Sequence, residues 1–184
     1  EDAFHIEHGE TVEQVMRYFA REFDPELASL LEADPGYAES ILAIGRGGAK
    51  PRKDLTTWKD VRAYVSFFYD AFFEPDYALP AAVSKADAAE ICRRFGESYD
   101  TTDEQPAWFE KIKQIAAALG YAPETKLYKK EPEAYKGHVG DVSMALRVAV
   151  TGRQNSPDLF EVMRILGRER VLARLTTMIE KIKD

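Results

Sequence analysis

The sequence contains few residues of the types that build redox and metal sites. Cys92 is its single cysteine, and it has three histidines among 184 residues. One cysteine excludes a disulfide within the chain, which fits a reducing compartment such as the cytoplasm. Because Cys92 lies in a helical apolar pattern, we interpret it as a buried structural thiol. His5 and His8 form an H-x-x-H pair, but His138 is the only other histidine, so no metal site is predicted.

Long apolar runs are also absent. No stretch approaches eighteen consecutive apolar residues, and no basic segment leads into an apolar one, so neither a membrane span nor a signal peptide is predicted. Carboxylates are numerous, but they lie on the polar faces of predicted helices and not in an apolar setting with a base or nucleophile. We therefore expect the chain to be non-catalytic by itself.

The charge is divided unevenly along the chain. The net charge is −7, yet residues 125–184 hold 12 lysines and arginines against 8 acidic residues, while the remainder holds 13 against 24. The C-terminal third is thus the basic end, and an acidic partner such as a nucleic acid would meet the protein there.

Apolar residues recur at spacings of three and four through most of the chain, which predicts an all-α fold. Helices are expected to begin near residues 11, 25, 37, 57, 85, 106, 132, 141, 157 and 168, and the one over residues 58–73 has the strongest pattern. Residues 97–105 are polar and acidic, without an apolar period. They divide the prediction into two consecutive helical bundles, residues 1–100 and 101–184.

The stretch over residues 135–175 has features that core packing alone does not explain. Val142, Ala145, Leu146 and Val150 give one buried helix face, and Gly152 stands where a left-handed helix cap is usual. Ser156-Pro157-Asp158 is predicted to start the next helix, with the Ser156 hydroxyl as its cap. The outward-facing amides of that helix, beside Arg147 and Arg153, would form a corner that holds an anion or an unstacked base.

Arg147 follows Leu146 inside this helix, so its guanidinium must reach solvent or meet a polar partner. The alternative to a binding role is a buried ion pair with Asp158 or Glu161. A second cationic segment, residues 45–53, is rich in glycine. It lacks the Lys-Ser/Thr ending of a P-loop and follows no predicted strand, which favours a connector with a cationic edge.

Three ordered motifs stand in this region: L-R-x-A-x-T-G at residues 146–152, S/T-P-x-L at residues 156–159 and L-G-x-E-R-x-x-x-R-L at residues 166–175. Together they resemble the C-terminal anticodon-binding region of bacterial glutamyl-tRNA synthetases. The resemblance is dense over about the last sixty residues and follows only the helix pattern elsewhere.

The resemblance implies which residues would touch tRNA. In the family, the arginine of the first motif contacts anticodon bases, which corresponds to Arg147, and the second motif contacts the same bases, which corresponds to Ser156, Pro157 and Leu159. Arg153, beside that corner, is expected to meet a phosphate. Some members read the third anticodon position with a further arginine; Asp54 stands there in this sequence, preceded by Arg52 and Lys53, whose cationic edge we expect to face tRNA.

The resemblance further implies that the chain is part of a longer ligase. Its catalytic domain, with ATP and Mg²⁺ as cofactors, would lie upstream on the same polypeptide, because the K-M-S-K-S signature of that domain is absent here. The expected partner is tRNA(Glu), with tRNA(Gln) as a further candidate, and the expected location is the cytoplasm. The alternative function is a non-catalytic helical protein–protein interaction module.

Overall fold

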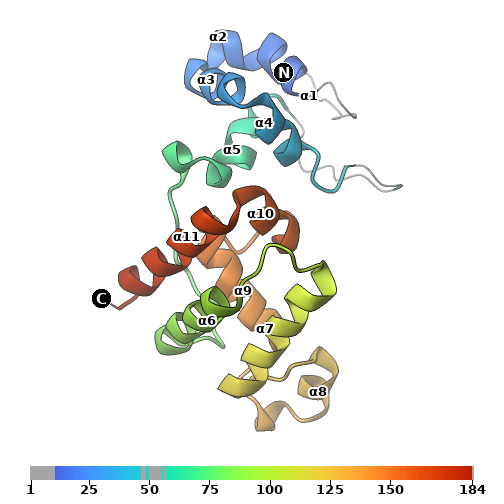
Figure 1. Cartoon of the computed structure of the whole chain (residues 1–184), viewed down its shortest axis with the longest axis vertical. Coiled ribbons are helices and arrows are strands. Elements are labelled where there is room, and N and C mark those ends of the chain that lie inside the picture. The colour runs from blue at the N-terminus through green and yellow to red at the C-terminus, as the bar shows by residue number, and fades with distance from the viewer. Residues whose placement is uncertain (1–10, 47–48, 50–54, 56, 184) are drawn as a thin grey trace. The chain divides into compact units, whose positions relative to one another are not determined.

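A computed structural model describes residues 11–46, 49, 55 and 57–183. Over these residues the chain is built of helices and has no strand beyond an isolated bridge between Ala122 and His138 (Figure 1). The all-α prediction is confirmed. None of the described helices is both long and apolar enough to cross a membrane. The chain divides into two compact units, Glu1–Phe73 and Glu74–Asp184.

Short helices make up the first unit. Two of them begin at an aspartate followed by proline: Asp24 Oδ1 accepts a hydrogen bond from the Leu27 amide at 3.1 Å, and Asp34 Oδ1 accepts one from the Tyr37 amide at 2.9 Å. The helical segments are α1 (Thr11–Val15), a π-helical turn (Met16–Ala20), α2 (Arg21–Phe23), α3 (Pro25–Ala33), α4 (Pro35–Leu42), α5 (Asp60–Val65) and two 3₁₀ turns (Ser66–Phe68 and Asp70–Phe72).

The prediction of one long helix over residues 58–73 is wrong. The α-helix ends at Val65, and Tyr69 is extended, with φ −115° and ψ 124°. Tyr64, Phe67, Phe68 and Tyr69 are all buried, and a continuous helix would point four such residues in several directions. The chain turns to bury them, and the Tyr37 hydroxyl donates to the Phe68 carbonyl at 2.6 Å.

The second unit packs its longer helices around α9, which contacts α6, α7 and α11. Val142, Ala145, Leu146 and Val150 of α9 are fully buried, as their spacing predicts. The elements in order are α6 (Lys85–Ser98), α7 (Gln105–Leu119), α8 (Thr125–Lys130), a 3₁₀ turn (Pro132–Ala134), α9 (Val139–Thr151), α10 (Leu159–Leu166) and α11 (Arg168–Lys181).

The division between the units falls at Phe73 and Glu74, whereas the sequence interpretation put it at residues 100 and 101. The reason is α6, whose apolar face packs against α7, α9 and α11. Gly96 does not end this helix. It faces Leu172 and Leu175 of α11, so it lies within a helix–helix contact, and only residues 99–104 separate α6 from α7 inside the second unit.

Candidate nucleic-acid interface

The site is built on the C-terminal end of α9. Gly152 adopts the left-handed conformation, with φ 68°, and its amide donates to the Val148 carbonyl at 2.8 Å. The Thr151 hydroxyl donates to the Arg147 carbonyl at 2.7 Å. The predicted glycine cap is therefore confirmed, and it turns the chain sharply into the loop of residues 152–155.

At its other end α9 begins at Val139, two residues before the predicted start near residue 141. His138, not Asp141, is the N-cap, and its ring nitrogen Nδ1 accepts from the Gly140 amide at 3.0 Å. Asp141 completes a capping box by accepting from the His138 amide at 2.9 Å. The Asp141 carboxylate thus acts from the third residue of the helix.

Arg147 bridges the end of α9 and the segment that leads into α10. Its Nη1 donates to the Pro157 carbonyl at 2.7 Å, to the Ser156 carbonyl at 3.2 Å and to the Ser156 hydroxyl. The side chain is half-buried. The positive charge is thus held against loop oxygens, and these contacts close the chain between Arg147 and Pro157 into a ring.

The predicted helix cap at Ser156 is wrong. α10 begins two residues later, and Asp158 is its cap, since Asp158 Oδ2 accepts from the Glu161 amide at 3.1 Å. The Ser156 hydroxyl interacts with Arg147 and donates to the Pro157 carbonyl at 2.8 Å. Because the Ser156 hydroxyl binds the Arg147 guanidinium, it does not accept from the helix amides. The Asp158 carboxylate caps the helix in its place.

Pro157 and Leu159 are buried, and Leu159 is only 3% exposed. In this conformation their side chains belong to the core of the second unit. A ligand at this corner would therefore meet their backbone groups, whereas half-buried Ser156 can offer both side chain and backbone.

Arg153, Gln154 and Asn155 form the exposed tip of the loop. Partial desolvation lowers the pKa of the Arg153 guanidinium from its ordinary value, although an arginine keeps its charge at neutral pH. The Arg153 amide donates to the Thr151 hydroxyl at 3.2 Å, which fixes the backbone at the start of the tip.

Arg174 of α11 binds the C-terminal end of α9, and the sequence interpretation assigned it no role, although it is the second arginine of the third motif. It is 4% exposed, and its Nη1 donates to the Val150 carbonyl at 2.7 Å. The signal that could have found it is its spacing. Arg174 falls between Val171 and Met178 on the apolar face of α11, where an arginine needs an internal acceptor.

The remaining predicted contacts cannot be placed. Arg52, Lys53 and Asp54 lie outside the described residues, as do His5 and His8. Among the residues that the structure does describe, no group of three or more histidine, cysteine or acidic side chains could hold a metal ion.

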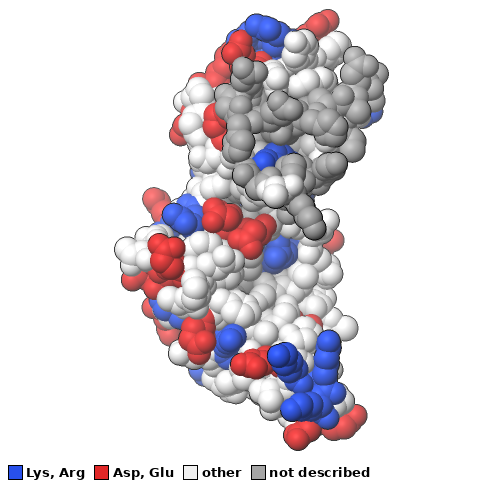
Figure 2. All heavy atoms as spheres, turned by 90° about the vertical axis from the view of Figure 1, so that its right-hand side faces the viewer, with Lys and Arg blue, Asp and Glu red and all other residues white. Residues whose placement is uncertain are grey.

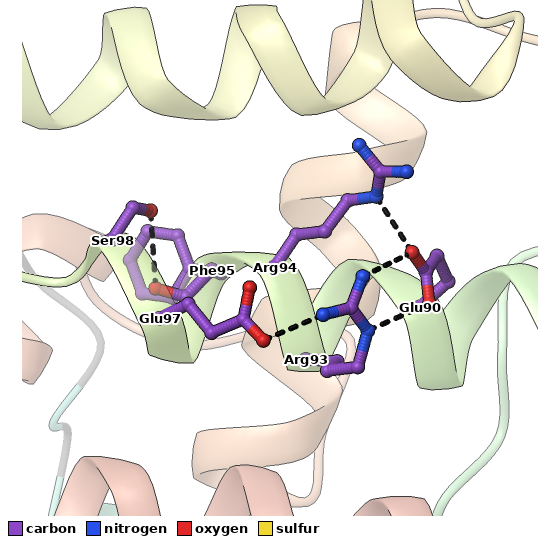
Figure 3. A network of polar contacts seen from close by, with 6 residues as sticks. All are labelled: Glu90, Arg93, Arg94, Phe95, Glu97 and Ser98. Atoms are coloured by element: carbon purple, nitrogen blue, oxygen red, sulfur yellow. Dashed lines mark hydrogen bonds and ion pairs between the residues drawn. The ribbon is translucent and has the colours of Figure 1, made fainter.

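Cationic side chains of the second unit also occur on α6 and α8, away from the loop of residues 152–155 in sequence. On α6, Glu90 accepts hydrogen bonds from Arg93 and Arg94, and Arg93 also binds Glu97 (Figure 3). The two arginines lower the pKa of Glu90 to about 2. Figure 2 shows lysines and arginines gathered at the end of the unit where Figure 1 places α8, whose Lys126, Lys129 and Lys130 are exposed.

Chemically, the corner offers a mixture of groups and not a purely cationic surface. Arg147 and Arg153 supply donors, whereas the Asp158 carboxylate supplies an acceptor and a negative charge at the start of α10. An anion bound directly at the α10 amides would be repelled by this carboxylate. Of the two ligands considered from the sequence, an unstacked base fits the corner better than an anion, because its edge carries both donors and acceptors.

Comparison with known proteins finds glutamate–tRNA ligases among the relatives of this chain. The chain is 52% identical to a glutamate–tRNA ligase of Sorangium cellulosum (strain So ce56) over 88% of its length. It is 39% identical over 92% of its length to the glutamate–tRNA ligase of Acetivibrio thermocellus, and 36% identical over 90% to that of Clostridium perfringens (strain 13 / Type A). The chain spans 28% to 31% of the length of these relatives.

The family profile described as an anticodon binding domain matches residues 10–179. This match takes in both compact units and nearly the whole chain. The resemblance inferred from three motifs is confirmed, and the chain belongs to the anticodon-binding domain family.

Proposed function

We propose that this chain recognises the anticodon loop of tRNA(Glu), with tRNA(Gln) as a second candidate substrate, as part of a glutamate–tRNA ligase. The observation that supports this most directly is the ring closed by Arg147 with Ser156 and Pro157. These contacts fix donors and acceptors beside the exposed loop tip of residues 153–155. Groups fixed in this way can bind the edges of unstacked RNA bases. Family membership supports the same proposal.

Within this proposal Arg147 and Ser156 contact base edges. Pro157 and Leu159 contribute through their backbone, since their side chains are buried. Arg153, at the exposed tip, meets the phosphate backbone of the loop. Arg52 and Lys53 are proposed as further tRNA contacts on the family resemblance alone.

The chemistry of the parent ligase would take place elsewhere on the polypeptide. We propose a catalytic domain upstream that uses ATP and Mg²⁺ to attach glutamate to the tRNA, in the cytoplasm. The present chain then supplies recognition only. This assignment rests on the relatives, of which the chain spans less than a third.

The test is binding of this chain to tRNA(Glu) and tRNA(Gln) transcripts, intact and with the anticodon replaced, at two salt concentrations. We expect tighter binding to the intact tRNA(Glu) transcript at both salts, and the tRNA(Gln) transcript measures the breadth of recognition. Binding that ignores the anticodon, or no binding at moderate salt, would contradict recognition by the isolated chain. The interaction-module alternative would then gain weight, and the exposed Tyr18 and Phe23 of the first unit would be its candidate contacts.

A further inference from the structure

We propose that the connector of residues 75–78, which begins two residues after the first unit ends, positions the recognition loop of residues 152–155. This inference rests on the proposed function, because the loop bears Arg153 and lies between Arg147 and Ser156. The connector is far from the loop in sequence and has no ligand-binding side chain assigned to it. Its contribution is the geometry that it imposes on the loop backbone.

Two hydrogen bonds join the connector to the loop. The Asp76 amide donates to the Gly152 carbonyl at 3.1 Å, and the Gln154 side-chain amide donates to the Ala78 carbonyl at 3.0 Å. The first fixes the loop where it leaves α9, and the second fixes its exposed tip. One connector of a few residues thus holds the loop at two points.

Close packing at Gly152 shows how tightly the two segments fit. A Cβ atom added at Gly152 would lie 2.5 Å from Pro75 Cα and 2.8 Å from Pro75 Cβ. Real Cβ atoms do not approach other carbons that closely. Glycine is therefore required at position 152 for two reasons. Its φ is positive, and Pro75 occupies the space where a Cβ atom would lie.

The residues on either side of the loop in sequence are also fixed. Arg174 binds the Val150 carbonyl from α11, and Arg147 binds the Ser156 and Pro157 carbonyls. Within the loop the Thr151 hydroxyl holds the Arg153 amide, and the connector adds its own contacts at Gly152 and Gln154 to these anchors. A change in the connector would therefore act on Arg153 and Gln154, the tip of the candidate interface.

The inference is tested by a pair of variants at Asp76, whose side chain is exposed. Asp76→Pro and Asp76→Ala both remove the carboxylate, but only Asp76→Pro removes the N–H that binds Gly152. The two variants are compared with each other by hydrogen exchange of the Gly152 and Arg153 amides and by the ratio of affinities for intact and anticodon-replaced tRNA(Glu). Thermal unfolding checks that both are folded.

We expect both amides to exchange about 3–10-fold faster in Asp76→Pro than in Asp76→Ala, which corresponds to loss of one backbone hydrogen bond. The anticodon-dependent affinity ratio should fall by a similar factor. Equal exchange in the two variants would overturn the link between connector and loop. Faster exchange with an unchanged affinity ratio would overturn the role in recognition.

Gln154→Ala provides a second route if Asp76→Pro fails to fold, since it removes the other hydrogen bond from an exposed position. Faster exchange of the Arg153 amide in this variant supports the inference, and unchanged exchange opposes it. If the unmodified chain does not distinguish anticodons, the proposed function fails and the recognition role falls with it. The exchange experiment still reports separately on whether the connector holds the loop.

Discussion

Arg147 has two roles that a single substitution would remove together. It closes the loop through the Ser156 and Pro157 carbonyls, and under the proposed function it also meets the anticodon bases. The structural role explains why an arginine can occur within a largely buried helix. Its stem is partly buried, while its guanidinium donates to the Ser156 and Pro157 carbonyls.

We expect Arg147→Ala to weaken binding of tRNA(Glu) by about 1–3 kcal/mol, through loss of a charge-assisted contact. Arg147→Lys keeps the charge but not the planar fork, so it should recover only part of this loss. The measurement is the dissociation constant of each variant, with thermal unfolding to confirm that it is folded. Unchanged affinity in a folded Arg147→Ala variant would show that this residue does not contact the RNA.

Gly152 and Gly120 allow the cost of close packing to be separated from the cost of backbone strain. Both end a helix in the left-handed region, with φ 68° and φ 87°, but a Cβ at Gly120 would meet only the Lys136 side chain, at 3.6 Å. Gly120→Ala should therefore cost about 1–2 kcal/mol of unfolding free energy from its φ alone. Gly152→Ala should cost about 1–3 kcal/mol more, because the connector must move.

Urea unfolding of the two glycine variants measures this difference. Since the strain is similar at the two positions, the excess for Gly152→Ala reports on contact with Pro75. Equal destabilisation by the two substitutions would mean that the connector yields without cost.

At the scale of the element, α6 shows how a surface network responds to pH. Hydrogen bonds from Arg93 and Arg94 lower the pKa of Glu90 from 4.5 to about 2 in the folded chain (Figure 3). Between these two values the unfolded chain binds the proton and the folded chain does not, so stability falls as the pH falls. The contribution of Glu90 is present above about pH 5 and is lost as the pH approaches 2.

Glu90→Gln should accordingly show a shallower loss of stability between pH 5 and pH 2 than the unmodified chain, because its side chain does not titrate. Glu110→Gln is the matched control. Glu110 is an exposed glutamate of α7, and the described residues provide it with no ion pair. The measurement is the free energy of unfolding of both variants and of the unmodified chain, by urea titration across this pH range. The same pH dependence in both variants would show that the α6 network has no net effect on stability.

Elements with one clear apolar face could be predicted from the sequence, as α9 shows. Its period of buried residues and its terminal glycine are local signals, and both are realised. The helix expected over residues 58–73 failed because its aromatic residues outnumber those that one helix face can bury. The cap at Ser156 failed for a different reason. Arg147 competes for the hydroxyl, and no local pattern reveals a contact across the loop.

At the scale of the whole molecule, the division into units was the hardest feature to predict. A polar stretch at residues 97–105 is a composition change without a break in packing, since the helices on both sides of it share one core. The contacts between the connector and the loop could not be predicted from the sequence either. Gln154 and Ala78 are far apart in sequence, and neither residue type at that place signals the hydrogen bond between them. Contacts of this kind arise from tertiary packing and leave no periodic trace.

The distribution of charge in the second unit separates the candidate interface from the basic surface on α8. The ring of Tyr128 in α8 lies 5.4 Å from that of His138, the residue at the start of α9, whereas Arg153 follows the end of α9. Thirteen helical residues separate the two ends of α9, which corresponds to about 20 Å. A phosphate bound by Arg153 would therefore lie about two Debye lengths from the end of α9 that adjoins α8.

Salt dependence distinguishes these two positions. Arg153→Ala should reduce the slope of log affinity against log salt for an anticodon hairpin of tRNA(Glu) by about 0.7, the value for one phosphate contact with a single strand. The double variant Lys129→Ala/Lys130→Ala removes more charge, but it should leave the slope unchanged, because α8 adjoins the end of α9 opposite to Arg153. An equal reduction by both variants would mean that net charge attracts the RNA without a defined phosphate contact. A reduction by the lysine variant alone would move the phosphate-binding surface to α8.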